Sequence, residues 1–191
     1  RSYVVAVGEV QAPLDLDVDA ATHRSRAEAA EGDDLRCPDA EVAAAMRRAV
    51  ARAVRERDTL GGLLVVVALG LPPGLGSHVH WDRRLGGRLM GALGSIPAVK
   101  GVEIGPAFAN AALPGTRVHD RIDRGDAGTL RRRSARAGGL EGGISTGEAL
   151  VLRAAMKPIS TTLTPLDSVD LATGEAAPTR YERSDFCAVP R

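Results

Sequence analysis

The 191-residue sequence has few aromatic residues, only two cysteines and no long apolar run. Phe, Trp and Tyr together make up 3% of the chain, so its core must be built from Val, Leu, Ala, Ile and Met. Cys37 and Cys187 lie far apart without metal-ligand spacing, which favours two free thiols over a disulfide. No stretch approaches the roughly 18 apolar residues of a membrane helix, and no signal peptide is visible.

The sequence also lacks a strong net charge and the common nucleotide-binding motifs. A formal net charge of +1 argues against a general nucleic-acid binder. Neither a Rossmann fingerprint nor a P-loop with its Gly-Lys-Ser/Thr ending is present. We therefore expect a cytoplasmic protein that has no nucleic-acid or membrane partner.

Both ends of the sequence fall within or close to strand-like runs. Arg1 is followed directly by the run 3–7, and Pro190-Arg191 follows another strand-like piece. Such ends are not typical of domain boundaries, so we expect residues 1–191 to be a single partial domain.

Hydrophobic periodicity predicts an α+β fold in which helices pack on sheet layers. Helices are expected from Asp39 and from Asp82, each of which suits an N-cap position. The polar segment 11–38 and the basic segment 106–137 are expected to be irregular, and 162–180 to form a hairpin that turns at Thr173-Gly174. The apolar or β-branched runs that predict strands lie at residues 3–10, 63–71 and 98–105.

The segment 138–161 joins a glycine-dense loop to an apolar run that ends on Lys157-Pro158-Ile159-Ser160-Thr161. Glycines allow close approach of the backbone to a ligand, and successive backbone N–H groups can bind an anion. Lysine and hydroxyl side chains add a charge and adaptable donors. The pattern fits an anion-binding loop, but composition alone favours a glycine-rich turn before a core strand.

Several other polar groups have both a structural and a functional interpretation. For most of them we favour the structural one, a solvated surface or an ordinary ion pair. Lys100 and Glu103 form either a charge pair near a site or an exposed edge, and Arg183-Ser184-Asp185 forms either an anion anchor with a base or a surface ion pair. The remaining groups are the alternating aspartates Asp15, Asp17 and Asp19, the pair His78 and His80, the arginines of 47–57, and His119-Asp120.

Six blocks of the sequence, in order, resemble the successive signatures of chorismate synthase. The likeness is good over 57–110 and 137–190 and loose elsewhere. The blocks are Asp58-Thr59-Leu60-Gly61-Gly62, LPPGLG at 71–76, AVKGVEIG at 98–105, AGGLEGGIS at 137–145, RAAMKPIST at 153–161 and RSDFCAVP at 183–190.

The resemblance implies a lyase of the shikimate pathway in aromatic amino-acid biosynthesis. Members convert 5-enolpyruvylshikimate 3-phosphate to chorismate by 1,4-anti-elimination of phosphate, and they require reduced FMN although the reaction is redox-neutral. The implied fold is an α+β sandwich of antiparallel sheets and helices, assembled as a homotetramer. NADP is implied as well, because the flavin must be reduced either by the chain itself or by a partner, and the residues leave this open.

The resemblance also carries individual roles to matching positions. The flavin contacts fall on Pro97, Ala98, Gly143, the segment Lys157, Pro158, Ile159, Ser160 and Thr161, and Arg183. Asp185 matches an aspartate that helps to remove the C6 proton of the substrate, which is a general-base role. No metal is implied.

The sequence also departs from the family pattern. Arg57 stands where a glycine is usual, Gly86-Gly87 replace a better helix pair, and Ala135 stands where the family usually has Asn. The Gly-Glu-Ser-His-Gly motif, the catalytic histidines and the phosphate arginines of the family do not occur in these residues. The alternative is a truncated, non-catalytic homologue that retains core and subunit contacts or weak flavin binding.

Overall fold

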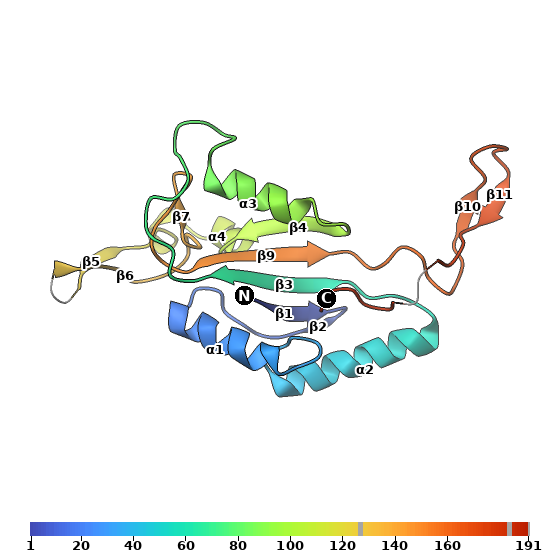
Figure 1. Ribbon diagram of the computed structural model, residues 1–191. Coiled ribbons are helices and arrows are strands. Elements are labelled where there is room, and N and C mark those ends of the chain that lie inside the picture. The colour runs from blue at the N-terminus through green and yellow to red at the C-terminus, as the bar shows by residue number, and fades with distance from the viewer. Residues whose placement is uncertain (126–127, 183–184, 191) are drawn as a thin grey trace.

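The computed structural model describes residues 1–125, 128–182 and 185–190 (Figure 1). Its strands are β1 Ser2–Val7, β2 Val10–Gln11, β3 Gly62–Ala68, β4 Val99–Ile104, β5 Ile122–Arg124, β6 Leu130–Arg132, β7 Leu140–Glu141, β8 Ile144–Ser145, β9 Leu150–Met156, β10 Asp167–Val169 and β11 Ala176–Pro178. Its helices are α1 Ala20–Glu31, α2 Ala40–Glu56, α3 Leu85–Gly94 and α4 Ala107–Ala111, with a short 3-10 turn at Gly115–Arg117.

The main sheet has five strands in the order β2-β1-β3-β9-β4, and every neighbouring pair is antiparallel. In the register of β9, Met156 lies opposite Gly62 of β3 and Val99 of β4, whereas Leu150 lies opposite Ala68. The fold is therefore mixed α+β with antiparallel sheets, as the sequence predicts. The three remaining sheets are two-stranded hairpins, β5–β6, β7–β8 and β10–β11.

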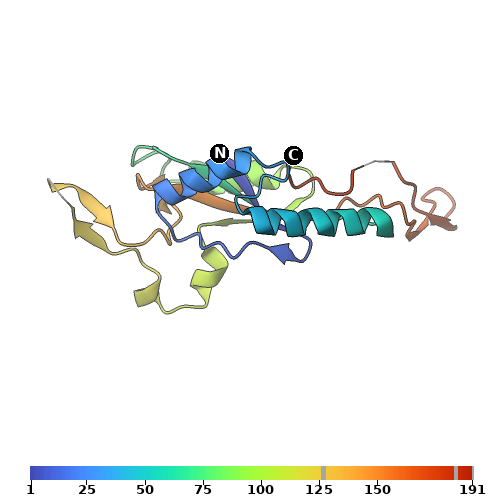
Figure 2. The same cartoon turned by 90° about the horizontal axis from the view of Figure 1, so that it is seen from below.

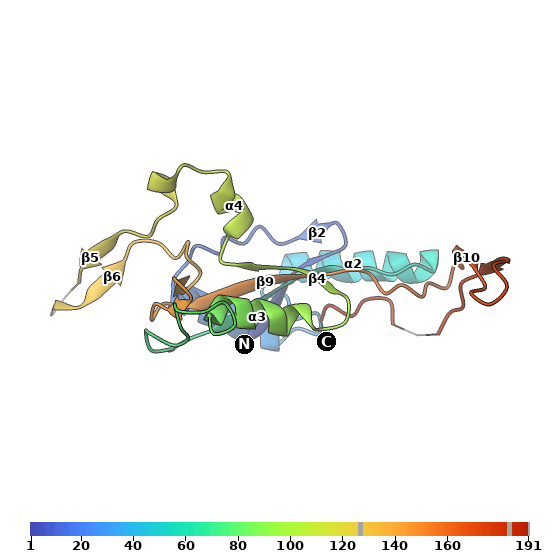
Figure 3. The ribbon, with the colours of Figure 1, turned by 90° about the horizontal axis from the view of Figure 1, so that it is seen from above.

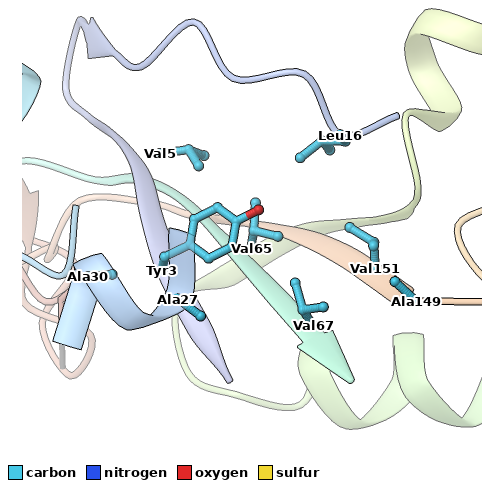
Figure 4. Close-up of a cluster of buried hydrophobic side chains, with 9 residues drawn as sticks. All are labelled: Tyr3, Val5, Leu16, Ala27, Ala30, Val65, Val67, Ala149 and Val151. Carbon is cyan, nitrogen blue, oxygen red and sulfur yellow. The ribbon is translucent and has the colours of Figure 1, made fainter. Parts of the chain in front are cut away.

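The side chains of β1 are divided between two hydrophobic clusters, and the strand has a register shift between Val4 and Ala6. Tyr3 and Val5 pack with Val65, Val67 and Val151 of the sheet and with small residues of α1 (Figure 4). Val4 and Val7 pack instead with Ala43 and Met46 of α2. Two helices thus cover β1, while α3 lies along the β4 side of the sheet, as the views from below and from above also show (Figures 2 and 3).

The prediction that a helix begins at Asp39 is confirmed. Asp39 is the N-cap, and its carboxylate accepts hydrogen bonds from the amides of Glu41 and Val42. The helix ends at Arg57, which adopts the left-handed conformation with φ 62°. A glycine is favoured at such a C-cap because it has no Cβ to clash, which explains why this departure from the family pattern matters locally.

Three expectations about local structure are wrong. The segment 11–38 contains α1, which is capped by Asp19. Asp82 does not cap α3: the N-cap is Arg84, and the Asp82 carboxylate lies 2.8 Å from Nδ1 of His80. The segment 106–137 is not simply irregular, because it includes α4 and the β5–β6 hairpin. The hairpin expected in 162–180 is confirmed as β10–β11.

Candidate functional site

Four segments that are distant in sequence meet where β9 ends. We call this place, made by residues 58–61, 97–98, 157–161 and 185–187, the Lys157 end. The amide of Lys157 donates to the carbonyl of Ala98 at 2.9 Å, and the amide of Leu60 donates to the carbonyl of Phe186 at 2.8 Å. Leu60 also forms an isolated parallel bridge with Cys187. The end of β9 is therefore hydrogen-bonded to 97–98, and 58–61 is hydrogen-bonded to 185–187.

Gly61 fixes how closely these segments approach one another. A Cβ at this position would lie 2.4 Å from the carbonyl oxygen of Met156 and 2.8 Å from the nitrogen of Pro158. Only a residue without a side chain can fill that space, because real Cβ atoms do not approach backbone atoms so closely. The glycine thereby sets the position of the chain just before the Ser160 and Thr161 hydroxyls.

Thr59 holds the same segment from the other side. Its side-chain hydroxyl donates to the carbonyl of Ile159 at 2.6 Å, and the residue is buried. The sequence prediction did not include Thr59 or Gly61 among the site residues. The signal lies in the block Asp58-Thr59-Leu60-Gly61-Gly62, whose family likeness by itself assigns no site role to these two residues.

The Lys157 segment presents a polar surface that suits an anionic, hydrogen-bonding ligand. Lys157, Pro158 and Ser160 are exposed, and Ile159 and Thr161 are half-buried. The hydroxyl oxygen of Thr161 is buried and has no hydrogen-bond partner, which is costly for a polar group unless a ligand or water satisfies it. The ammonium of Lys157 and these hydroxyls are a donor set that fits the phosphate and ring edge of FMN.

Pro97 and Ala98 form the second wall of the Lys157 end. Pro97 is exposed in the turn between α3 and β4, and Ala98 is half-buried. Ala98 has φ 71°, a left-handed conformation that is uncommon for a residue with a side chain. This conformation turns the Ala98 carbonyl toward the amide of Lys157, so the predicted contacts at 97–98 and 157–161 are neighbours.

Asp185 lies beside the same end, because the next residues, Phe186 and Cys187, pair with Leu60. Asp185 is half-buried. Arg183, the other predicted residue of this block, lies outside the described residues. Cys187 is half-buried, and its burial raises the pKa of the thiol. Both cysteines are free, as the sequence predicts.

Gly143 lies at the opposite end of β9, in the tight turn of the β7–β8 hairpin. We call residues 72–77, 84–87 and 138–149 the Gly143 end. Gly143 has φ 92°, and a Cβ there would lie 2.6 Å from the carbonyl oxygen of Ser77. Its own carbonyl accepts the amide of Leu85 at 2.9 Å, at the start of α3.

The structure therefore does not gather all the predicted flavin residues at one place in a single copy. The seven residues of β9 separate Gly143 from Lys157, which at about 3.4 Å per residue amounts to roughly 20 Å. Beside Gly143 an open groove of about 340 Å³ is lined by Gly86, Gly87, Met90, Ile104 and Leu140, among others. Its lining is mostly apolar, unlike the polar Lys157 end.

The charged residues for which the sequence allows two interpretations have structural roles. Glu103 is buried and pairs with Arg153 across β4 and β9, while its other oxygen accepts the amide of Phe108 at 3.0 Å. Lys100 is exposed, and Glu103 pairs with Arg153 instead of with Lys100. Asp120 accepts the amides of Arg136 and Ala137, so it holds that loop.

The alternating aspartates are likewise structural rather than freely solvated. Asp17 pairs with Arg136 at 3.1 Å and accepts the amide of Ala135, Asp19 caps α1, and Asp15 accepts the amide of Asp17. On α2, Arg47 pairs with Asp33 and Asp34, as the structural interpretation expects. Among the described residues, no three His, Cys, Asp or Glu side chains gather closely enough to bind a metal ion.

In the described part of the chain, no helix has both the length and the apolar character needed to cross a membrane.

Comparisons with known proteins place the whole sequence in one family. A family model described as chorismate synthase matches residues 1–191. A chorismate synthase of Nocardioides sp. (strain ATCC BAA-499 / JS614) is 53% identical over 194 residues, covering 99% of this chain and 47% of that protein. One of Thermobifida fusca (strain YX) is 52% identical over 189 residues, with coverages of 99% and 47%.

A solved structure agrees. A protein whose structure is titled "Crystal Structure of Chorismate Synthase" superposes with a TM-score of 0.79 at 40% identity, covering 84% of this chain and 49% of that one. The chain thus spans about half the length of the curated relatives it matches. The family model matches all of this chain and the solved structure most of it, and the chain belongs to the chorismate synthase family.

Proposed function

We propose that this chain forms the part of a chorismate synthase that holds reduced FMN and supplies the general base. The reaction is the 1,4-anti-elimination of phosphate from 5-enolpyruvylshikimate 3-phosphate, which gives chorismate. The observation that carries the proposal is the meeting of 58–61, 97–98, 157–161 and the Asp185 segment at one end of the sheet, in a chain that matches the family along its whole length.

The Lys157 end performs the binding part of this function. The ammonium of Lys157 attracts the dianionic phosphate of the cofactor, and Ser160 and Thr161 donate hydrogen bonds to its polar groups. The orphaned Thr161 hydroxyl gains a partner when a ligand binds. Pro97 and Ala98 form the facing wall, and Arg183 belongs to the proposed set as a further cation. When bound, reduced FMN supplies the electron-rich flavin that the family reaction requires.

Asp185 performs the proton-transfer part. A proton leaves C6 of the substrate, a new carbon–carbon double bond forms, and the phosphate departs with the electron pair of its C–O bond. The carboxylate of Asp185 acts as the base that takes up the proton equivalent lost in this step. No net oxidation occurs, so the proposed cofactor is needed in its reduced form but is not consumed.

The proposal also includes the compartment, the assembly and the pathway in which the chain works. We propose that the chain works in the cytoplasm, as part of a homotetramer, in the shikimate pathway. The source of electrons for the flavin, whether NADPH used by the chain or a partner reductase, is a separate question that the flavin site does not decide. The alternative is a non-catalytic homologue, and the pair Gly86-Gly87 inside α3 is the observation that favours it, because each weakens a helix by about 1 kcal/mol relative to Ala.

The test uses a chimera in which residues 1–191 replace the matching half of the Nocardioides relative. We expect this chimera to form chorismate anaerobically from 5-enolpyruvylshikimate 3-phosphate with reduced FMN. Asp185→Asn in the chimera should lower turnover at least about 100-fold, the usual scale for loss of a general base, while FMN binding is kept. The 191-residue chain alone should show no phosphate release above background, because the family histidines and phosphate arginines do not occur in it.

A control is Asp167→Asn, which removes an exposed carboxylate from the segment that follows Thr161. It should leave turnover unchanged. Near-normal turnover in Asp185→Asn would remove Asp185 from the mechanism. A folded chimera that binds FMN but releases no phosphate would support the non-catalytic alternative instead.

A further inference from the structure

The loop 159–161 at the Lys157 end is held in a different way from the residues on either side of it. Before the loop, Pro158 lies against Gly61, where an added Cβ would meet the Pro158 nitrogen at 2.8 Å. After the loop, the amide of Thr164 donates to the carbonyl of Arg57 at 3.2 Å. Both flanks of the loop are thus fixed against the backbone that leads from α2 into β3.

Within the described residues, one hydrogen bond connects that backbone segment to the loop itself. It runs from the hydroxyl of Thr59 to the carbonyl of Ile159, at 2.6 Å. Thr59 is only 7% exposed, so the bond lies in a low-dielectric environment, where a hydrogen bond is stronger than in water. Ile159 is half-buried, whereas the next residue, Ser160, is exposed. The Thr59 hydroxyl is therefore the contact that orients the loop.

The orientation of the Ile159 carbonyl also determines where the amide of Ser160 points. The peptide bond between these two residues is trans, and in a trans peptide the carbonyl and the N–H that follows it point in opposite directions. Because Thr59 holds the carbonyl on its own side, the Ser160 amide points away from Thr59. In the part of the chain that the structure describes, this amide has no hydrogen-bond partner.

The Ser160 amide adds a fixed donor to the other donors of the Lys157 end. The exposed ammonium of Lys157 is a point charge on a flexible stem, which loses side-chain entropy when it is held by a ligand. A backbone amide loses little entropy on binding once its peptide plane is fixed. The next residue, Thr161, has a buried hydroxyl oxygen that also lacks a partner. Backbone N–H groups held in this way are typical of phosphate sites.

We propose that Thr59 is a positioning residue of the flavin site, whose hydroxyl fixes the Ile159 carbonyl and thereby aims the Ser160 amide at the phosphate of the cofactor. Thr59 itself does not touch the ligand. It acts by holding the loop in its binding conformation before the ligand arrives, which lowers the cost of binding. The inference rests on the proposed function, because it takes the ligand of the Lys157 end to be FMN.

The test measures the binding of FMN and of riboflavin, which has no phosphate, to the chimera that carries Thr59→Val. Valine keeps the branched shape of threonine but has no donor, so the loop loses its hydrogen bond while the space stays filled. We expect FMN to bind at least about tenfold more weakly and riboflavin to keep its affinity. Thr59→Ser retains the donor and should keep FMN affinity within about threefold. Thr59→Ala is a second variant without a donor and should give the same result as Thr59→Val.

A matched control is Ser145→Ala at the Gly143 end. The hydroxyl of Ser145 also donates to a backbone carbonyl at 2.6 Å, that of Pro72, and Ser145 is only 3% exposed. Loss of this hydroxyl should lower the urea midpoint of the chimera. The ratio of FMN affinity to riboflavin affinity should nevertheless stay that of the unmodified chimera. The control thus separates general loosening of the fold from the loss of an aimed donor.

The outcomes separate this inference from the function on which it rests. An unmodified chimera that binds FMN no more tightly than riboflavin would refute the proposed phosphate site, and the role of Thr59 with it. Where the unmodified chimera prefers FMN, an unchanged preference in the folded Thr59→Val and Thr59→Ala variants would overturn the positioning role alone. An equal loss of affinity for both flavins, or a Thr59→Ser variant as weak as Thr59→Val, would overturn it as well.

Discussion

At both the Lys157 end and the Gly143 end of β9, a glycine lies directly against a neighbouring backbone, but the surfaces beside the two glycines differ. At the Lys157 end, Gly61 lies against the backbone of Met156 and Pro158, beside a lysine and two hydroxyls. At the Gly143 end, Gly143 lies against Ser77 in a left-handed turn beside a mostly apolar groove. The side chains of the first end suit an anion, and those of the second suit an apolar surface.

This contrast shows that close backbone approach does not by itself identify a binding site. Both ends have it, yet in the described residues only the Lys157 end combines it with a buried hydroxyl that lacks a partner. The polar part of the proposed flavin site is thus assigned to one end by its side chains. The glycines decide only how near the chain segments lie.

The largest effect should come from filling the glycine positions. Gly61→Ala is expected to destabilise the 191-residue chain by about 3 kcal/mol, because the added methyl group must displace backbone atoms. Gly143→Ala is expected to cost about 2 kcal/mol, mainly for the left-handed conformation. Urea unfolding of both variants measures these losses as shifts of the midpoint.

Flavin binding separates the two variants more sharply than stability does. In the chimera, Gly61→Ala should weaken FMN binding more than Gly143→Ala does. Equal loss of FMN affinity in the two folded variants would mean that the two ends are not distinct in the way described above.

Low pH should have a smaller effect on stability, and this effect should come from a residue that belongs to neither end of β9. His23 of α1 is fully buried, with Nδ1 2.9 Å from the hydroxyl of Tyr3. Burial, followed by the nearby Arg26 cation, holds the pKa of His23 below its ordinary value of 6.5, although Asp19 opposes the shift. Burial likewise raises the pKa of Tyr3, so both groups stay neutral near pH 7.

The sign of the pH dependence follows from the lowered pKa of His23. Below pH 6.5 the unfolded chain binds a proton that the folded chain does not, so stability is lost as the pH falls from 6.5 toward the folded-state pKa. His23→Gln should flatten this part of a plot of unfolding free energy against pH. An unchanged slope in that variant would assign the acid sensitivity to other groups, and FMN binding to the chimera should be unaffected by the substitution.

The smallest predicted change concerns Arg57, where α2 turns toward the Lys157 end. Arg57→Gly should stabilise the chain by about 0.5–1 kcal/mol, because glycine adopts the left-handed C-cap without a Cβ clash. The substitution loses only an exposed hydrogen bond of 3.3 Å to the carbonyl of Leu163. Arg55→Gly, two residues earlier inside the helix, should instead destabilise by about 1 kcal/mol. The same sign for both variants would contradict the explanation.

Much of the fold could be predicted from local pattern. Asp39 and the apolar repeat of α2 predict that helix with its N-cap, and the apolar runs predict β3 and β4. The helix α1 was missed because its buried residues are Ala27, Ala30 and His23, which form no apolar stripe. The burial of α1 depends on the sheet beneath it, where Tyr3 and Val65 supply the large apolar side chains (Figure 4).

The candidate site could be predicted only in part. Lys157 to Thr161 was singled out from its residue types, but the approach of 58–61, 97–98 and 185–187 depends on the register of β9 with β3 and β4. Local sequence does not determine that register, so the family resemblance had to supply the grouping. The resemblance in turn could not show that Gly143 lies a full strand away from Lys157.

The assignment of the polar flavin site to the Lys157 end is tested most directly by FMN titration of the chimera carrying Lys157→Ala. Loss of the ammonium should weaken FMN binding at least about tenfold, while riboflavin, which lacks the phosphate, should bind as before. The exposed Lys100→Ala variant serves as the matched control and should bind FMN normally. Unchanged FMN affinity in a folded Lys157→Ala chimera would contradict the assignment.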